Sequence, residues 1–231
     1  MRRSKRIWKK SKSTLRYFFL TMAIILSFCS CGGKKPVQKP VQEEDSIVLD
    51  STYMFDGKTL NGWEITNFGP QGPVEVSGGR IILGMGDGCT GITWKGDFPS
   101  VGYEVTLDAM RVSGNDFFCG MTFPVNKSPC TLIVGGWGGT VVGLSSINGK
   151  DASENETTKL MKFEKGQWYK IKLEVTESTI KVWIDDELVV NFNFTGKALS
   201  IRPEVQLSKP FGIASWCTTA AMKNIRVRKI D

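Results

Sequence analysis

The sequence predicts an all-β fold, a sandwich of two antiparallel sheets, and three observations support it. After residue 50, short segments alternate apolar and polar side chains, which is the pattern of half-buried strands. No stretch of that part keeps a 3.6-residue apolar period over three turns, so no long amphipathic helix is expected. The chain has 25 glycines, which suit many tight turns between short strands. Two sheets packed face to face account for all three features.

Residues 1–30 have the pattern of a lipoprotein signal peptide. This leader has eight basic residues and no acidic one, and it ends in an uncharged, mostly apolar segment over residues 17–30. That segment has 14 residues, fewer than the roughly 20 that a membrane-spanning helix needs. Cys31 follows a serine and precedes two glycines, a context that resembles a lipobox, so Cys31 is the expected site of lipid attachment. An uncleaved N-terminal anchor, or acylation at Cys29, remains an alternative, and each of these interpretations exports the rest of the chain.

The charge distribution argues against a nucleic-acid partner. The formal net charge is +7, but without the leader 22 basic and 23 acidic residues remain, a net charge of −1. The membrane contact is therefore expected through the lipid anchor alone, which places the protein in the cell envelope. Gly32 lacks the aspartate that retains lipoproteins at the inner membrane, which favours the outer membrane or cell surface. Residues 31–46 are rich in lysine, proline and acidic residues and predict a flexible tether.

Residues 47–231 are expected to form a single sandwich domain. Residues 74–76 and 81–83 predict a hairpin around a Ser-Gly-Gly-Arg turn, and residues 179–184 and 187–194 predict another around Asp185 and Asp186. Further strands are expected in the alternating segments 104–112 and 169–176 and in the terminal segment 222–230.

The cysteines of the domain leave two interpretations open. Cys89, Cys119, Cys130 and Cys217 are even in number, and export permits disulfides, for example Cys119 with Cys130 and Cys89 with Cys217. Four buried free thiols are the alternative, since free cysteine packs as a small hydrophobe. A zinc site is not expected, because the chain has no CxxC motif and no histidine.

Three segments of the domain carry a resemblance to a known family. Residues 53–63 read YMFDGKTLNGW, residues 166–175 with 181–189 read GQWYKIKLEV and KVWIDDELV, and residues 211–215 with 222–228 read FGIAS and MKNIRVR. These segments resemble the 3-keto-disaccharide hydrolase family, and the resemblance covers about residues 50–231. It implies a concanavalin A-like jelly roll that acts on glycosides whose sugar is oxidised at C3. The ketone acidifies the C2 proton, so cleavage by elimination, followed by addition of water, requires a base, an electrophilic group near the ketone and an acid.

The candidate site residues come from the middle of the chain, onto which the family's catalytic residues are not mapped. Trp137 lies between four glycines in Gly-Gly-Trp-Gly-Gly, so it is either a platform for a sugar ring or a core residue with bends around it. Asp151, Glu154 and Asn155 lie in an acidic segment with turn composition, which either binds sugar or is simply solvated.

Two further residues complete the prediction. Asp116 precedes an apolar strand and is either a turn residue or a groove residue, and Arg111 ends a predicted strand. With no histidine available, Asp116 or Glu154 is the expected base, while Trp137, Asn155, Arg111 and Asp151 are the expected substrate-binding residues.

The sequence predicts no cofactor and no protein-held metal cluster, although the acidic segment leaves a bound Ca²⁺ or another divalent cation open. The leading hypothesis is a carbohydrate-cleaving enzyme. The alternatives are a noncatalytic carbohydrate-binding module and an interaction sandwich of the envelope, because sandwiches host many functions.

Overall fold

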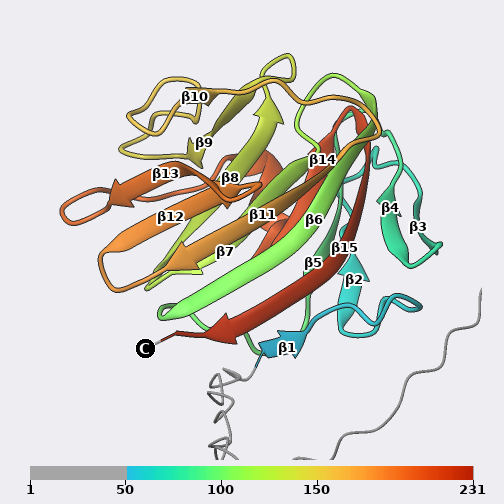
Figure 1. Cartoon of the computed structure of the whole chain (residues 1–231), viewed down its shortest axis with the longest axis horizontal. Helices are drawn as coiled ribbons and strands as arrows, with labels where there is room; N and C mark the ends of the chain where they lie inside the picture. The colour runs from blue at the N-terminus through green and yellow to red at the C-terminus, as the bar shows by residue number, and fades with distance from the viewer. Residues whose placement is uncertain (1–50, 231) are drawn as a thin grey trace, which may run out of the picture. The chain divides into compact units, whose positions relative to one another are not determined.

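The computed structural model describes residues 51–230, which form two antiparallel sheets (Figure 1). The eight-stranded sheet follows the order β13-β12-β11-β6-β15-β4-β3, with β1 also paired to β15. Its strands are β1 (Ser51–Tyr53), β3 (Val74–Ser77), β4 (Arg80–Leu83), β6 (Tyr103–Gly114), β11 (Trp168–Val175), β12 (Thr179–Ile184), β13 (Glu187–Asn193) and β15 (Thr218–Lys229).

The seven-stranded sheet lies behind it in Figure 1 and follows the order β10-β9-β8-β7-β14-β5-β2. Its strands are β2 (Trp63–Ile65), β5 (Cys89–Trp94), β7 (Cys119–Val125), β8 (Ser128–Gly136), β9 (Val141–Ser145), β10 (Lys159–Leu160) and β14 (Gly212–Trp216). A 3-10 helix, η1 (Pro203–Ser208), precedes β14. The all-β sandwich expected from the sequence is confirmed.

The alternating segments form the strands that the sequence predicts. Along β11, Ile171, Leu173 and Val175 are fully buried, while the residues between them face outward. The turn from β12 to β13 is also as predicted: Asp185 and Asp186 both have positive φ, 48° and 67°, as a two-residue type I′ hairpin requires.

Large apolar side chains fill the space between the two sheets. Phe118, Phe123, Phe211 and Tyr103 are completely buried there, and the ring of Phe211 stacks on Phe98 with centroids 4.3 Å apart. This core fixes the two sheets against each other and leaves each with one outer face.

The outer face of the seven-stranded sheet is not open to solvent over its whole length. Ile201, just before η1, and Val205, on η1, pack with Cys89 and Ala214 of that face in one small apolar cluster. Ala152 packs with Ile133 and Val141 in another, under the loop that follows β9. The central strands of this sheet are therefore buried on both faces.

The four cysteines of the described region are free thiols. Cys119 pairs in register with Val134, and Cys130 with Phe123, so the two cysteines lie four residues apart along neighbouring strands. That offset is about 13 Å at roughly 3.3 Å per residue, too far for a disulfide between Cys119 and Cys130.

The leader, Cys31 and the whole of the expected tether lie outside the described residues. Within residues 51–230, no helix has the length and apolar character needed to cross a membrane.

Candidate functional site

A pocket of about 170 Å³ opens on the outer face of the seven-stranded sheet, between the two coverings of that face. Its floor comes from β5, β8, β9 and β14, and its walls come from the β6–β7 loop, the β8–β9 turn and η1. The lining residues are Cys89, Asp116, Phe117, Thr131, Ile133, Trp137, Ser145, Arg202, Glu204, Val205 and Trp216. The pocket brings together two of the residues that the sequence predicts, Asp116 and Trp137.

Asp116 presents a half-buried carboxylate to this pocket. Its Oδ1 accepts a hydrogen bond of 2.7 Å from the backbone N–H of Phe117, and its Oδ2 accepts a long one of 3.5 Å from Gly138. No lysine or arginine among residues 51–230 forms an ion pair with it. Asp116 Oδ2 therefore accepts only one long hydrogen bond and has no cation paired with it, so it is the oxygen open to a ligand.

Arg202 connects two other carboxylates at the rim of the pocket. Its guanidinium pairs with Asp151 Oδ2 and forms a fork with Glu204, with Nη2 2.8 Å from Oε1 and Nε 3.3 Å from Oε2. The hydrogen bond to Arg202 lowers the pKa of Glu204, and the same bond raises the pKa of Arg202. Glu204 is thus held as an anion and is a poor proton acceptor.

Asp151 lies behind Arg202 and outside the lining. Its Oδ1 accepts hydrogen bonds from Ser146 Oγ at 3.1 Å and from Ser145 Oγ at 3.3 Å. Ser145 belongs to the pocket floor, so Asp151 links the floor to the arginine at the rim. The structure gives Asp151 the role of positioning Arg202.

Three aromatic rings line the pocket. Trp137 is 41% exposed and lies in the wall, so its side chain is not part of the core. Its φ of +46° is rare for a bulky residue, and such strained conformations concentrate at ligand sites. Trp216 and Phe117 add two further rings, with centroids 6.5 Å apart. Together the three rings offer apolar faces to the C–H groups of a sugar.

Arg111, predicted to bind substrate, instead holds the turn that carries Trp137. It is buried, with 5% of its surface exposed, and its Nη2 donates to the carbonyls of Gly135 at 3.1 Å and Gly139 at 2.9 Å. Burial lowers its pKa, and the nearby Asp116 opposes that shift. Arg111 lies outside the pocket lining, because its donors satisfy backbone carbonyls that no strand partner reaches.

Asn155 and Glu154 also lie outside the pocket lining. The amide nitrogen of Asn155 donates to the carbonyls of Leu144 and Asp151, both at 2.7 Å, and its oxygen accepts from Thr157 N–H and hydroxyl. Asn155 therefore closes the edge of β9 in place of a neighbouring strand. Glu154 is exposed, and its side chain makes no hydrogen bond within the described chain.

The pocket contains residues that sequence reasoning did not single out, above all Arg202, Glu204 and Trp216. In the sequence, Arg202 and Glu204 are visible only as the motif Arg-Pro-Glu, a cation two residues before an acid. Many exposed ion pairs have the same spacing, so the motif is a weak indication of a binding site. Trp216 directly follows FGIAS, one of the segments that carry the family resemblance. No group of three or more His, Cys, Asp or Glu side chains in residues 51–230 is arranged to hold a metal ion.

Known protein families and solved structures give a second, independent view of this domain. The family described as the 3-keto-alpha-glucoside-1,2-lyase-like domain matches residues 50–228. A comparison with curated protein sequences gives no match.

Several solved structures share the fold. The carbohydrate-binding module CBM66 from Bacillus subtilis has a TM-score of 0.52 at 18% identity, covering 77% of this chain and all of its own. A laminarinase from Flavobacterium sp. UMI-01 has a TM-score of 0.51 at 13% identity, covering 78% of this chain and all of its own. The Crh5 transglycosylase in complex with NAG has a TM-score of 0.55 at 12% identity, covering 78% of this chain and 84% of its own. At these identities the likeness shows the fold alone.

Proposed function

Because the chain belongs to the family of 3-keto-alpha-glucoside-1,2-lyase-like domains, we propose that its pocket binds 3-keto-glycosides and cleaves them with Asp116 as the base. The membership makes this a carbohydrate-active domain, and the finer assignment rests on the pocket. The observation that carries it is the weakly bonded Oδ2 of Asp116, in one pocket with three aromatic rings and a fixed arginine.

The reaction follows from the acidity of a C–H bond next to a ketone. Asp116 takes the proton from C2, the electrons form the C1–C2 double bond, and the C1–O bond of the glycoside breaks. The same carboxyl group then returns the proton to the departing oxygen, which leaves as an alcohol, and water adds across the double bond to complete a net hydrolysis. One carboxyl group thus serves as base and acid, which suits a chain without histidine.

The other pocket residues stabilise this path. Arg202 is the cation in the pocket lining, so it stabilises the negative charge that develops on the keto oxygen, and its two carboxylate partners fix its position. Trp137, Trp216 and Phe117 orient the sugar ring, so that its C2–H points toward Asp116. A pocket of about 170 Å³ matches one sugar ring and leaves the rest of the glycoside outside.

The test is turnover of a 3-keto-glucoside by the purified protein and by Asp116→Asn. We expect the variant to lose about 10²–10⁴-fold in kcat, the usual contribution of a positioned base, with little change in substrate affinity. Release of the alcohol, followed over time, measures the rate.

Glu154→Gln is the matched control, because it also removes one carboxylate but at an exposed position outside the lining. It is expected to keep the full rate. A slow Glu154→Gln variant beside an active Asp116→Asn variant would identify Glu154 as the base. No turnover by the unaltered protein would contradict the proposed enzymatic activity.

A noncatalytic carbohydrate-binding module is the second candidate, favoured by the complete lack of histidine. It predicts that the protein binds glycosides through Trp137 and Trp216 and releases no product. Binding of glycosides with zero turnover selects this candidate over the first.

A further inference from the structure

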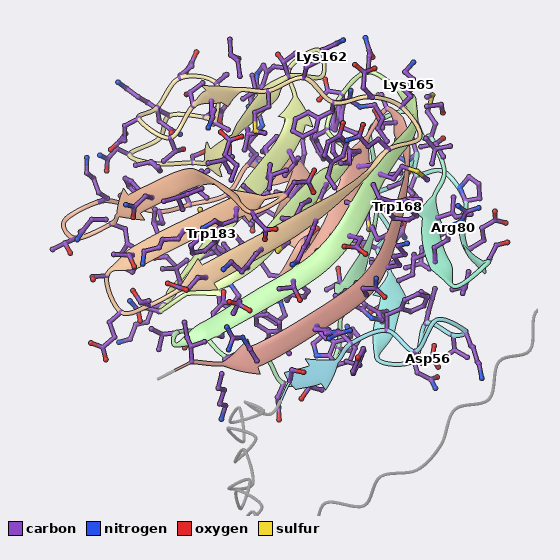
Figure 2. The ribbon with its side chains drawn as sticks, in the orientation of Figure 1. Asp56, Arg80, Lys162, Lys165, Trp168 and Trp183 are labelled. Atoms are coloured by element: carbon purple, nitrogen blue, oxygen red, sulfur yellow. The ribbon has the colours of Figure 1, made fainter. Side chains whose placement is uncertain are left out.

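A row of five side chains crosses the outer face of the eight-stranded sheet, on the opposite sheet from the pocket. Trp183 of β12 is in register with Lys172 of β11, and Lys172 with Thr106 of β6. Thr106 is in register with Arg226 of β15, and Arg226 with Tyr53 of β1. We call these five residues the cationic row. Figure 2 labels Trp183 of this row, and Trp168 farther along the same sheet.

The two cations of the row are held by aromatic rings. Lys172 Nζ lies 3.8 Å from the ring centroid of Trp183, and Arg226 Cζ lies 4.2 Å from that of Tyr53. These contacts orient the cations but leave their charge uncancelled. In the described part of the chain, neither Lys172 nor Arg226 forms an ion pair with a carboxylate. Lys223, one row away, is held in the same manner, 4.3 Å from the ring of Trp168.

The acids of the neighbouring rows are already bound by other groups. Glu104 accepts two hydrogen bonds of 2.8 Å from Arg228, and Glu174 pairs with Lys181 at 3.4 Å. On the other side, Asp108 accepts a hydrogen bond of 2.6 Å from Asn224. Glu104 and Glu174 are thus paired with other cations, while Asp108 keeps its charge but lies in register with Lys170 and Lys223. No acid among residues 51–230 forms an ion pair with Lys172 or Arg226.

The centre of the row has the form of a binding surface. Arg226 and Thr106 line a depression of about 350 Å³ together with Ser51, Glu104, Lys170, Val227 and Arg228. Its one carboxylate, Glu104, is paired with Arg228, so Lys170 and Arg226 leave the depression with an excess of positive charge. The Nε of Arg226 is buried there without a hydrogen-bond partner, and a buried donor in this state favours an acceptor from a ligand. Lys172 and Arg226 are two strand spacings apart, about 10 Å, so one extended ligand can reach both.

We propose that the cationic row is a second glycan site, which binds the carboxylate groups of an acidic polysaccharide. Guanidinium and ammonium groups recognise carboxylate oxygens, the hydroxyl of Thr106 suits a sugar hydroxyl, and the positive ring edges of Trp183 and Tyr53 suit sugar oxygen atoms. A lipid surface fits less well, because membrane-binding faces insert apolar side chains, whereas the rings of Trp183 and Tyr53 are stacked against Lys172 and Arg226. The charge of the row is complementary to acidic glycans, whereas the pocket, with two carboxylates and one arginine in its lining, favours neutral sugars.

The experiment measures binding of oligogalacturonate to the full chain in detergent by calorimetry. The double variant Lys172→Gln/Arg226→Gln is expected to weaken binding about tenfold or more, because two charge-assisted contacts are lost. Binding of the unaltered chain is expected to weaken as salt rises.

The matched control is Lys162→Gln/Lys165→Gln, which removes the same charge from the exposed loop before β11, at the top of Figure 2. It is expected to bind as the unaltered chain does, which separates the row from the basic leader and from net charge. Turnover at the pocket is expected to be unchanged in Lys172→Gln/Arg226→Gln, so a failure here and a failure of the proposed function are seen separately.

Four outcomes overturn the proposal. They are no binding of oligogalacturonate, equal losses in the two double variants, equally tight binding of polyphosphate, and binding to phosphatidylglycerol vesicles in place of oligogalacturonate. The third would show a patch for any polyanion, and the fourth a membrane-binding face.

Discussion

Asn155 and Arg111 show, at the scale of single residues, how a polar side chain that suggests a ligand can instead complete the backbone. Both lie where the chain leaves regular pairing, at the edge of β9 and at the β8–β9 turn. Backbone groups at such places need partners, and these side chains provide them. Composition cannot tell this role from sugar binding, because both use the same amide and guanidinium donors.

Replacing Asn155 with Ala tests this role. The change leaves the buried N–H of Thr157 and carbonyl of Leu144 without partners, so the free energy of unfolding should fall by about 2–3 kcal/mol. Urea denaturation measures the loss. Glu154→Ala, one residue away and exposed, should change it by no more than about 0.5 kcal/mol. A stable Asn155→Ala variant with weakened glycoside binding would return Asn155 to the site.

At the scale of elements, the strands of the two sheets differ in how well the sequence predicts them. Strands of the eight-stranded sheet bury one face and alternate, so β6, β11 and β12 were predicted from periodicity. In the seven-stranded sheet β5, β7, β8 and β9 are buried almost throughout, because η1 and the loop after β9 cover the outer face. A strand buried on both faces has no alternation to detect.

The strands β7 and β8 carry a consequence for alkaline pH. Burial raises the pKa of Cys119 and Cys130 to about 12, from the usual 9.0 of an exposed thiol. Between these two pH values the unfolded chain has lost its thiol protons while the folded chain retains them, so rising pH favours unfolding. Stability should hold below about pH 8 and then fall through pH 9 to 12, by up to about 1.4 kcal/mol per pH unit for each thiol.

Urea denaturation at a series of pH values measures this slope, and Cys119→Ala/Cys130→Ala is the comparison. The double variant is expected to lose stability overall but to show a shallower fall above pH 9. The same slope in both proteins would contradict the assignment of the effect to these thiols.

At the scale of the whole molecule, the domain presents two faces of different character, an aromatic pocket with acidic groups and a cationic row. We infer that one face holds an acidic polymer while the other processes a glycoside. We propose, from the leader and the lipobox-like context, that the chain is exported and anchored at the cell envelope through Cys31.

Mass spectrometry of the mature protein tests the anchor. We expect the N-terminal peptide to begin at a lipid-modified Cys31, and Cys31→Ser to release the protein from the membrane fraction. An unmodified peptide that begins upstream of Cys31 would contradict this prediction.

The sequence by itself determined the all-β class, the hairpin at Asp185–Asp186, the family, and two pocket residues, Asp116 and Trp137. These follow from local causes: side-chain alternation, turn chemistry and motifs that are contiguous in the chain. Only the tertiary structure decided that Arg202, Glu204 and Trp216 join those two residues, and that Asn155 and Arg111 serve the backbone. The physical reason is that a pocket forms where distant segments meet across a sheet, and no local pattern records which segments meet.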